Sequence, residues 1–67
     1  MSPELTAHKL VAQTVVELGK HGIDPRSIRS ALALNLVLCC RHDHPHGDQG
    51  ALLDVQAVLS NPPRRAG

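Results

Sequence analysis

Apolar and polar residues follow each other along this chain with helical spacing, and no segment shows the alternation typical of a strand. From Pro3 to about Leu18, apolar residues recur every three or four positions, which places them on one face of a helix. Ser2 and Pro3 mark the start of this helix, and Gly22 is suited to end it in a left-handed conformation. The buried face is predicted to comprise Ala7, Leu10, Val11, Thr14, Val15 and Leu18.

The second predicted helix, about 25–41, is apolar on every side instead of on one. Asp24 and Pro25 repeat the pattern of a cap followed by proline at its start. When successive residues are placed about 100° apart, only Asn35 interrupts the apolar belt from Ile28 to Cys40. A helix that is apolar all round has to be covered all round. The run is shorter than the roughly 18 apolar residues of a membrane span, so no membrane segment is expected.

A shorter third helix is predicted over about 49–60, with Asp48 as its cap and a firm end at Pro62. Short connections favour antiparallel neighbours, so we expect an all-α fold, a helical hairpin plus a short third helix. The domain is expected to cover 1–61, followed by a flexible tail at 62–67. The chain has no aromatic residues, and a protein of this size buries only about 60% of its unfolded surface. We therefore expect two copies to pack as a symmetric dimeric bundle.

The expected interface, with a second copy or with a larger protein, lies on the second helix and on the exposed parts of the first and third helices. A polar residue such as Asn35 inside a helical seam can bond to its counterpart and fix the register at some cost in stability. The alternative is an edge position, where Asn35 bonds to water or to a backbone carbonyl. The function that this pattern favours is that of a non-enzymatic accessory or regulatory subunit, which binds itself and another protein. The predicted interface residues are Leu34, Asn35, Val37, Leu38, Leu52, Val55 and Leu59.

Composition narrows the function classes further. The two cysteines are adjacent in sequence, so they cannot form a framework that links distant segments. The first residues lack the basic and apolar regions of a secretory signal, and we expect a cytoplasmic protein. A fold this small rarely encloses a pocket for a substrate, so neither an enzyme nor a catalytic residue is expected. A catalytic pair of Cys40 and His44 is disfavoured because Pro45 opposes a helical conformation at His44.

The segment from Cys39 to Asp48 concentrates thiol, imidazole and carboxylate groups, which are ligands of zinc, nickel and copper. If the segment is extended, its three alternating histidines point to the same side. The spacing matches no established zinc motif, and a solvated histidine-rich loop is the plainer interpretation. A metal sensor or carrier is therefore a second alternative function, and no cofactor is otherwise expected. The candidate ligands are Cys40, His42, His44 and His46.

A glycine turn between two helices also suggests a helix-turn-helix, and a small DNA-binding transcriptional regulator is the first alternative function. Arg26 and Arg29 stand near the start of the second helix, where a recognition helix would contact the major groove. The formal net charge is only +1, whereas DNA-binding domains normally carry a marked basic excess. We favour the interpretation that both arginines solubilise the exposed end of the helix.

Overall fold

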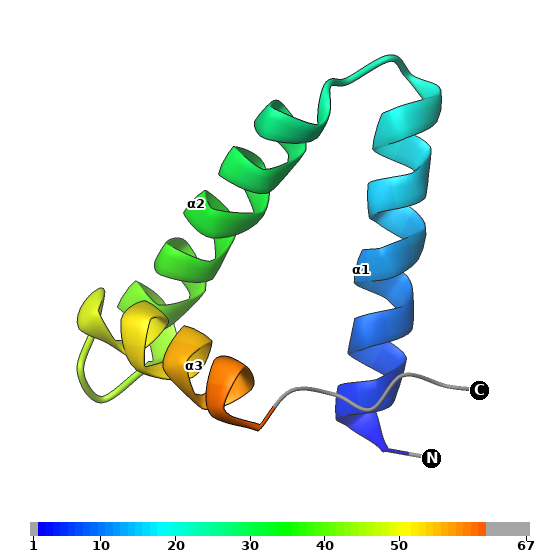
Figure 1. The fold of residues 1–67 in the computed structure, drawn as a ribbon. Coiled ribbons are helices and arrows are strands. Elements are labelled where there is room, and N and C mark those ends of the chain that lie inside the picture. Colours follow the sequence, from blue (N-terminus) through cyan, green and yellow to red (C-terminus); the bar gives the residue numbers. More distant parts are fainter. Residues whose placement is uncertain (1, 62–67) are drawn as a thin grey trace. The chain divides into compact units, whose positions relative to one another are not determined.

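The computed structural model describes residues 2–61, and within that range it contains three helices and no strand (Figure 1). α1 spans Pro3–Lys20, α2 spans Pro25–Asp43 and α3 spans Gln49–Ser60. The predicted all-α class with three helices is confirmed. All three helices begin where the sequence predicts, whereas α1 and α2 extend two residues beyond their predicted ends. The tail predicted at 62–67 lies outside the described residues.

The chain divides into two compact units, Met1–Leu32 and Ala33–Gly67, and α2 contributes to both. The N-terminal unit contains α1, the first turn region and the start of α2. The C-terminal unit contains the rest of α2, the corner after it and α3. The single domain predicted over 1–61 and its dimeric packing stay predictions. Among the residues described, no helix combines the length and the apolar content needed to cross a membrane.

In the N-terminal unit, α1 ends in a Schellman motif. The N–H of Ile23 donates to the carbonyl of Leu18 over 3.1 Å, and the N–H of Gly22 donates to Gly19 over 3.0 Å. This pattern requires a left-handed residue after the helix, and Gly22 supplies it with φ of 80°. The predicted stop at Gly22 is confirmed, and the helix runs through Gly19 because the motif satisfies the carbonyls of its last turn.

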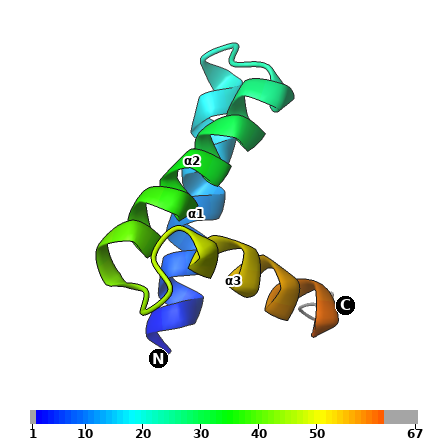
Figure 2. The same cartoon turned by 90° about the vertical axis from the view of Figure 1, so that its left-hand side faces the viewer.

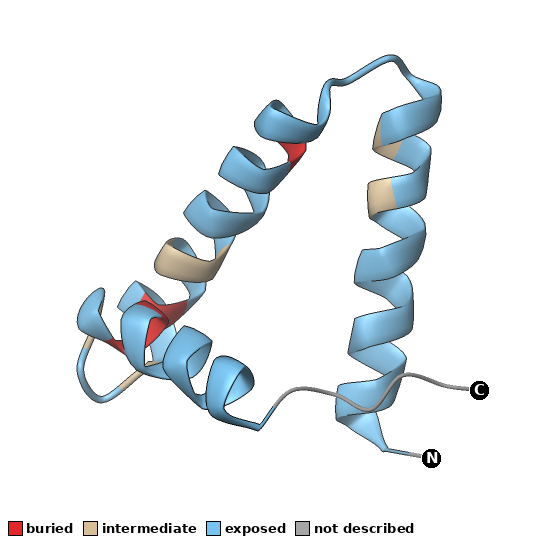
Figure 3. Ribbon diagram, in the orientation of Figure 1, coloured by how far each residue is buried: buried red, intermediate tan, exposed pale blue. Residues whose placement is uncertain are grey.

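The start of α2 is capped by Asp24, as predicted. The carboxylate of Asp24 accepts hydrogen bonds from the Ser27 N–H over 3.0 Å and from the Ser27 hydroxyl over 2.7 Å. These bonds lower the pKa of Asp24 below 3.8. Ile28, one turn further on, is buried, while Val15 and Leu18 on the last turns of α1 are half-buried (Figure 3). Apolar packing in this unit is therefore concentrated near the turn.

At the start of α1, Ser2 occupies the cap position in extended conformation, but its side chain makes no capping bond. Asp48 likewise occupies the predicted cap position of α3, but its side chain makes no hydrogen bond to the first turn of that helix. Its carboxylate instead accepts two hydrogen bonds from Arg41, at 2.9 and 3.1 Å. The pair joins the end of α2 to the start of α3, and the bonds from Arg41 lower the pKa of Asp48.

Small residues form the contact between α2 and α3 in the C-terminal unit. Cys40, Gly50 and Ala51 are buried where the beginning of α3 lies beside the last turns of α2 (Figures 2 and 3). Residues with short side chains let two helix backbones approach closely. Larger apolar side chains of α3 remain exposed, among them Leu59 at 73%. The core of this unit is accordingly small.

Candidate functional site

The corner between α2 and α3 is organised around His44. Its N–H continues the helical pattern and donates to the Cys40 carbonyl over 2.8 Å, and its own carbonyl accepts from Gly47 over 3.0 Å. Ring atom Nδ1 accepts from the His46 N–H over 3.0 Å. With 22% of its side chain exposed, His44 is held by both its backbone and its ring.

Gly50 is required by the position of this ring. A Cβ atom added at Gly50 would overlap the His44 imidazole, because the ring lies directly against the α3 backbone. Gly19, which is also helical, faces open space instead. The two helical glycines therefore have different roles, and only Gly50 is needed for a close contact.

Asp54 on α3 faces both His44 and Cys40. The Cys40 thiol donates to Asp54 Oδ2 over 3.6 Å, and His44 Nε2 lies 3.6 Å from Asp54 Oδ1. Burial, and then the bond to Asp54, raise the pKa of the Cys40 thiol above 9.0. Nucleophilic attack and metal binding both use the thiolate, so the raised pKa leaves Cys40 suited to packing and to hydrogen-bond donation.

Cys40, His44 and Asp54 form what we call the corner cluster. An open hollow of about 250 Å³ lies beside it. It is smaller than the roughly 300–1,000 Å³ of typical ligand pockets. Its lining comprises Leu36, Cys39, Cys40, Asp43, His44, Pro45 and Asp54.

The extended loop assumed for the metal-site hypothesis is wrong. α2 continues to Asp43, because Pro45 restricts only the residue directly before it. His42 therefore lies on the helix, with its Nε2 3.7 Å from Asp43 Oδ1 on an exposed surface. Within residues 2–61 no three His, Cys, Asp or Glu side chains are grouped so that they could hold a metal ion.

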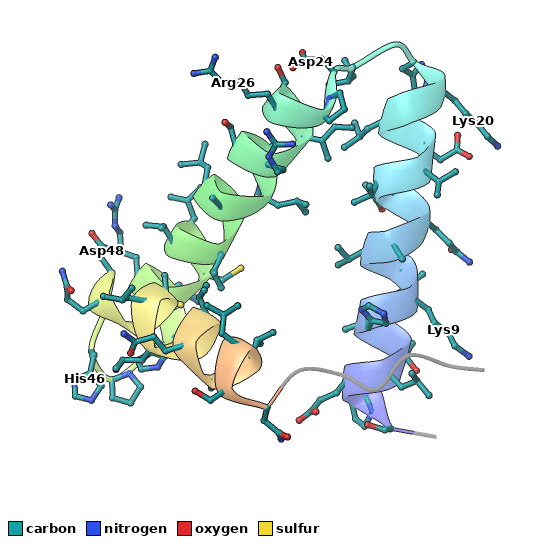
Figure 4. The ribbon with its side chains drawn as sticks, viewed as in Figure 1. Lys9, Lys20, Asp24, Arg26, His46 and Asp48 are labelled. Carbon is teal, nitrogen blue, oxygen red and sulfur yellow. The ribbon has the colours of Figure 1, made fainter. Side chains whose placement is uncertain are left out.

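The candidate ligands are thus distributed over different environments. The rings of His44 and His46 have their centroids 5.6 Å apart and are tilted by 41°. Figure 4 shows His46 at the turn that follows α2. Cys40 is buried under α3, whereas His42 is exposed. The structure brings Cys40 and His44 to the same carboxylate, and it does not bring His42 to them.

Most of the predicted interface residues are exposed on the C-terminal unit. Leu34 on α2 is 59% exposed, whereas Val37 is half-buried. Asn35 is exposed and already has an interaction partner. The other predicted interface residues, Leu38, Leu52, Val55 and Leu59, are exposed.

Two further hollows flank α3 on this unit. One, of about 370 Å³, is lined mainly by aliphatic side chains of α2 and α3 together with Asp48 and Gln49. The other measures about 220 Å³ and is lined by Leu36, Asp54, Val55, Val58 and Leu59. Both combine apolar walls with a single carboxylate.

Arg26 and Arg29 lie exposed on the first turns of α2. Figure 4 shows Arg26 beside Asp24, so the start of this helix carries both signs of charge. Residues 21–24 connect α1 to α2. A role of either arginine in DNA binding stays a prediction.

Gly50 and Asp54 were not recognised from the sequence as parts of a site. A signal was present, since Gly50, Ala51 and Asp54 have the spacing of one helix face. A glycine inside a helical pattern sometimes has a packing reason, as Gly50 does and Gly19 does not.

The chain matches no protein family model, no curated protein and no solved structure.

Proposed function

We propose that this protein is a non-enzymatic helical interaction protein that acts as a homodimeric accessory or regulatory subunit. The interface between the two copies is formed by α2 and by the exposed parts of α1 and α3. The observation that carries the proposal is the exposure of large apolar side chains on the C-terminal unit. They are Leu34, Leu38, Leu52, Leu53, Val55, Val58 and Leu59.

The free energy available from covering these side chains supports a dimer. Complete burial of a Leu or Val side chain contributes about 1.5–3 kcal/mol. In the described part of the C-terminal unit, by contrast, the only buried residues are Cys40, Gly50 and Ala51. A core this small gives little stability, and small helical proteins commonly gain the remainder by association. Large exposed apolar patches are typical of protein interfaces.

Sedimentation velocity across the micromolar range tests the proposal. We expect a dimer for the native chain and a shift to monomer for Leu38→Glu, because that charge would be buried in the interface. The matched control is Ser30→Glu, which places the same charge at an exposed position of α2 outside the predicted interface. A folded monomer at every concentration would contradict the proposed function.

A further inference from the structure

One of the hollows beside α3 has a mainly apolar lining. Val55, Val58 and Leu59 of α3 line it with helical spacing, and Leu36 of α2 lines it too. At about 220 Å³ it is too small for most small-molecule ligands. Apolar rows at three- and four-residue spacing are instead the surfaces on which amphipathic helices dock. We call this hollow the α3 groove.

The charge around the groove is acidic. Asp54 is the charged residue of its lining, and the two other hollows on this unit add Asp43 and Asp48. Asp48 is paired with Arg41, whereas Asp54 faces a thiol and an imidazole. A helix that covers the groove would therefore be favoured by a cation opposite Asp54.

The two units of the chain differ in charge. Residues 33–61 carry one basic and three acidic side chains, whereas residues 2–32 carry four basic and three acidic ones, with histidine taken as neutral. The C-terminal unit of a second copy would bring charge of the same sign to the groove. The N-terminal unit of a second copy would bring charge of the opposite sign.

α1 has a second face suited to this groove. Val15 and Leu18 are half-buried on the side near Ile28. A separate row follows the helix at spacings of four, three and four residues, and its two large apolar members are exposed. This row consists of Leu5, Lys9, Ala12 and Val16.

Lys9 is the cation within this row. In Figure 4 it extends from α1 on the side away from the start of α2. Lys20 is paired with Glu17 over 3.4 Å. Lys9 has no carboxylate partner among the residues that the structure describes.

We infer that, in the homodimer, α1 of the second copy covers the α3 groove and places Lys9 of the partner subunit against Asp54. The inference rests on the proposed function, since it assigns the segment of the partner that completes the interface. A two-fold axis makes the contact twice, once for each groove. The apolar row of α1 and the aliphatic row of α3 then cover each other.

A double-mutant cycle on dimer dissociation tests this pairing. We expect Lys9→Gln and Asp54→Asn each to weaken the dimer about tenfold, because two symmetric ion pairs are lost. The double variant should be no weaker than either single variant, since the interaction is removed once. Lys20→Gln is the matched control on α1 and should leave the dissociation constant unchanged.

Circular dichroism shows whether each variant is folded, because Asp54 also bonds to Cys40. Lys9→Gln keeps the inference testable if Asp54→Asn unfolds, since Lys9 is exposed and outside the corner cluster. A dimer in which Lys9→Gln has no effect, or in which the two effects add, would overturn the inference and leave the proposed function intact. A monomer at all concentrations would overturn both.

Discussion

The contact between Gly50 and the His44 ring fixes how closely α3 approaches α2. The ring is anchored at Nδ1 by His46 and lies near Asp54 through Nε2, so it has little freedom to move aside. A side chain larger than hydrogen at Gly50 therefore displaces the ring and breaks at least one of these interactions. Residue-scale packing at one position determines the geometry of the whole corner.

Gly50→Ala should lower the free energy of unfolding by about 1–3 kcal/mol, the usual cost of forcing extra volume into a packed site. The matched control is Gly19→Ala, where the new methyl group meets open space. That change should raise stability by roughly 0.5–1 kcal/mol through helix propensity. Thermal unfolding at equal protein concentration measures the change in stability of both variants. Equal effects of the two substitutions would contradict the contact between Gly50 and the His44 ring.

The two cysteines should differ in reactivity. Cys39 is exposed, whereas Cys40 is 4% exposed and has a raised pKa, first through burial and then through Asp54. Near neutral pH, iodoacetamide should modify Cys39 about tenfold faster or more, because the thiolate is the reacting species. Peptide mass spectrometry resolves the two sites, and unfolding in denaturant should remove the difference.

The raised pKa of the Cys40 thiol also predicts how the stability of the protein changes at alkaline pH. A thiol whose pKa is raised in the folded state contributes its stability fully below the ordinary value of 9.0. That contribution is lost as pH rises through the folded pKa, because the unfolded chain releases its proton first. The decline should be absent in Cys40→Ser, whereas Cys39→Ser should retain it.

At the scale of helices, Asp24 provides the side-chain cap at the start of α2. The Asp24 carboxylate bonds to the first turn of α2, so Asp24→Ala should lower the melting temperature by about 5 °C. The lowered pKa of Asp24 means that its contribution is present above pH 3.8 and is lost as pH falls through the folded pKa. The difference in melting temperature between the native chain and Asp24→Ala should therefore disappear at acidic pH. A difference that persisted there would contradict the charged cap.

Local chemistry explains which parts of these elements were predictable. Pro3 and Pro25 follow cap residues, and both helix starts were predicted correctly from neighbouring residues alone. Asp48 occupies the predicted cap position of α3, but its carboxylate is bonded to Arg41, seven residues earlier, and makes no capping bond. A bond of this kind depends on how two helices meet, and the sequence pattern does not give that geometry.

The candidate site at the corner between α2 and α3 was also predictable only in part. The density of polar groups after Cys39 pointed to the corner of the C-terminal unit, where Cys40 and His44 face Asp54 in the structure. The histidine arrangement was wrong because helix α2 persists to Asp43, which turns His42 away from the others. The partners that Cys40 and His44 adopt in the fold come from α3, and a pattern confined to one segment contains no information about them.

At the scale of the whole molecule, DNA binding can be separated from protein association. We expect the native chain and an Arg26→Gln, Arg29→Gln double variant to show the same weak, salt-sensitive retention on duplex DNA. The reason is that a formal net charge of +1 gives little counterion release. Fluorescence anisotropy over a range of salt concentrations measures the affinity of each protein for duplex DNA. Tight binding that disappears in the double variant would favour the transcriptional regulator instead.

Dimerisation makes the stability of the protein depend on protein concentration. If folding and dimerisation are linked, the melting temperature rises with protein concentration, because dissociation and unfolding share one equilibrium. With about 0.7 kcal/mol of unfolding enthalpy per residue in each copy, a tenfold increase in concentration should raise it by roughly 5 °C. Leu38→Glu should abolish this dependence and Ser30→Glu should preserve it. A melting temperature independent of concentration in the native chain would mean that its exposed leucines stay uncovered by a second copy.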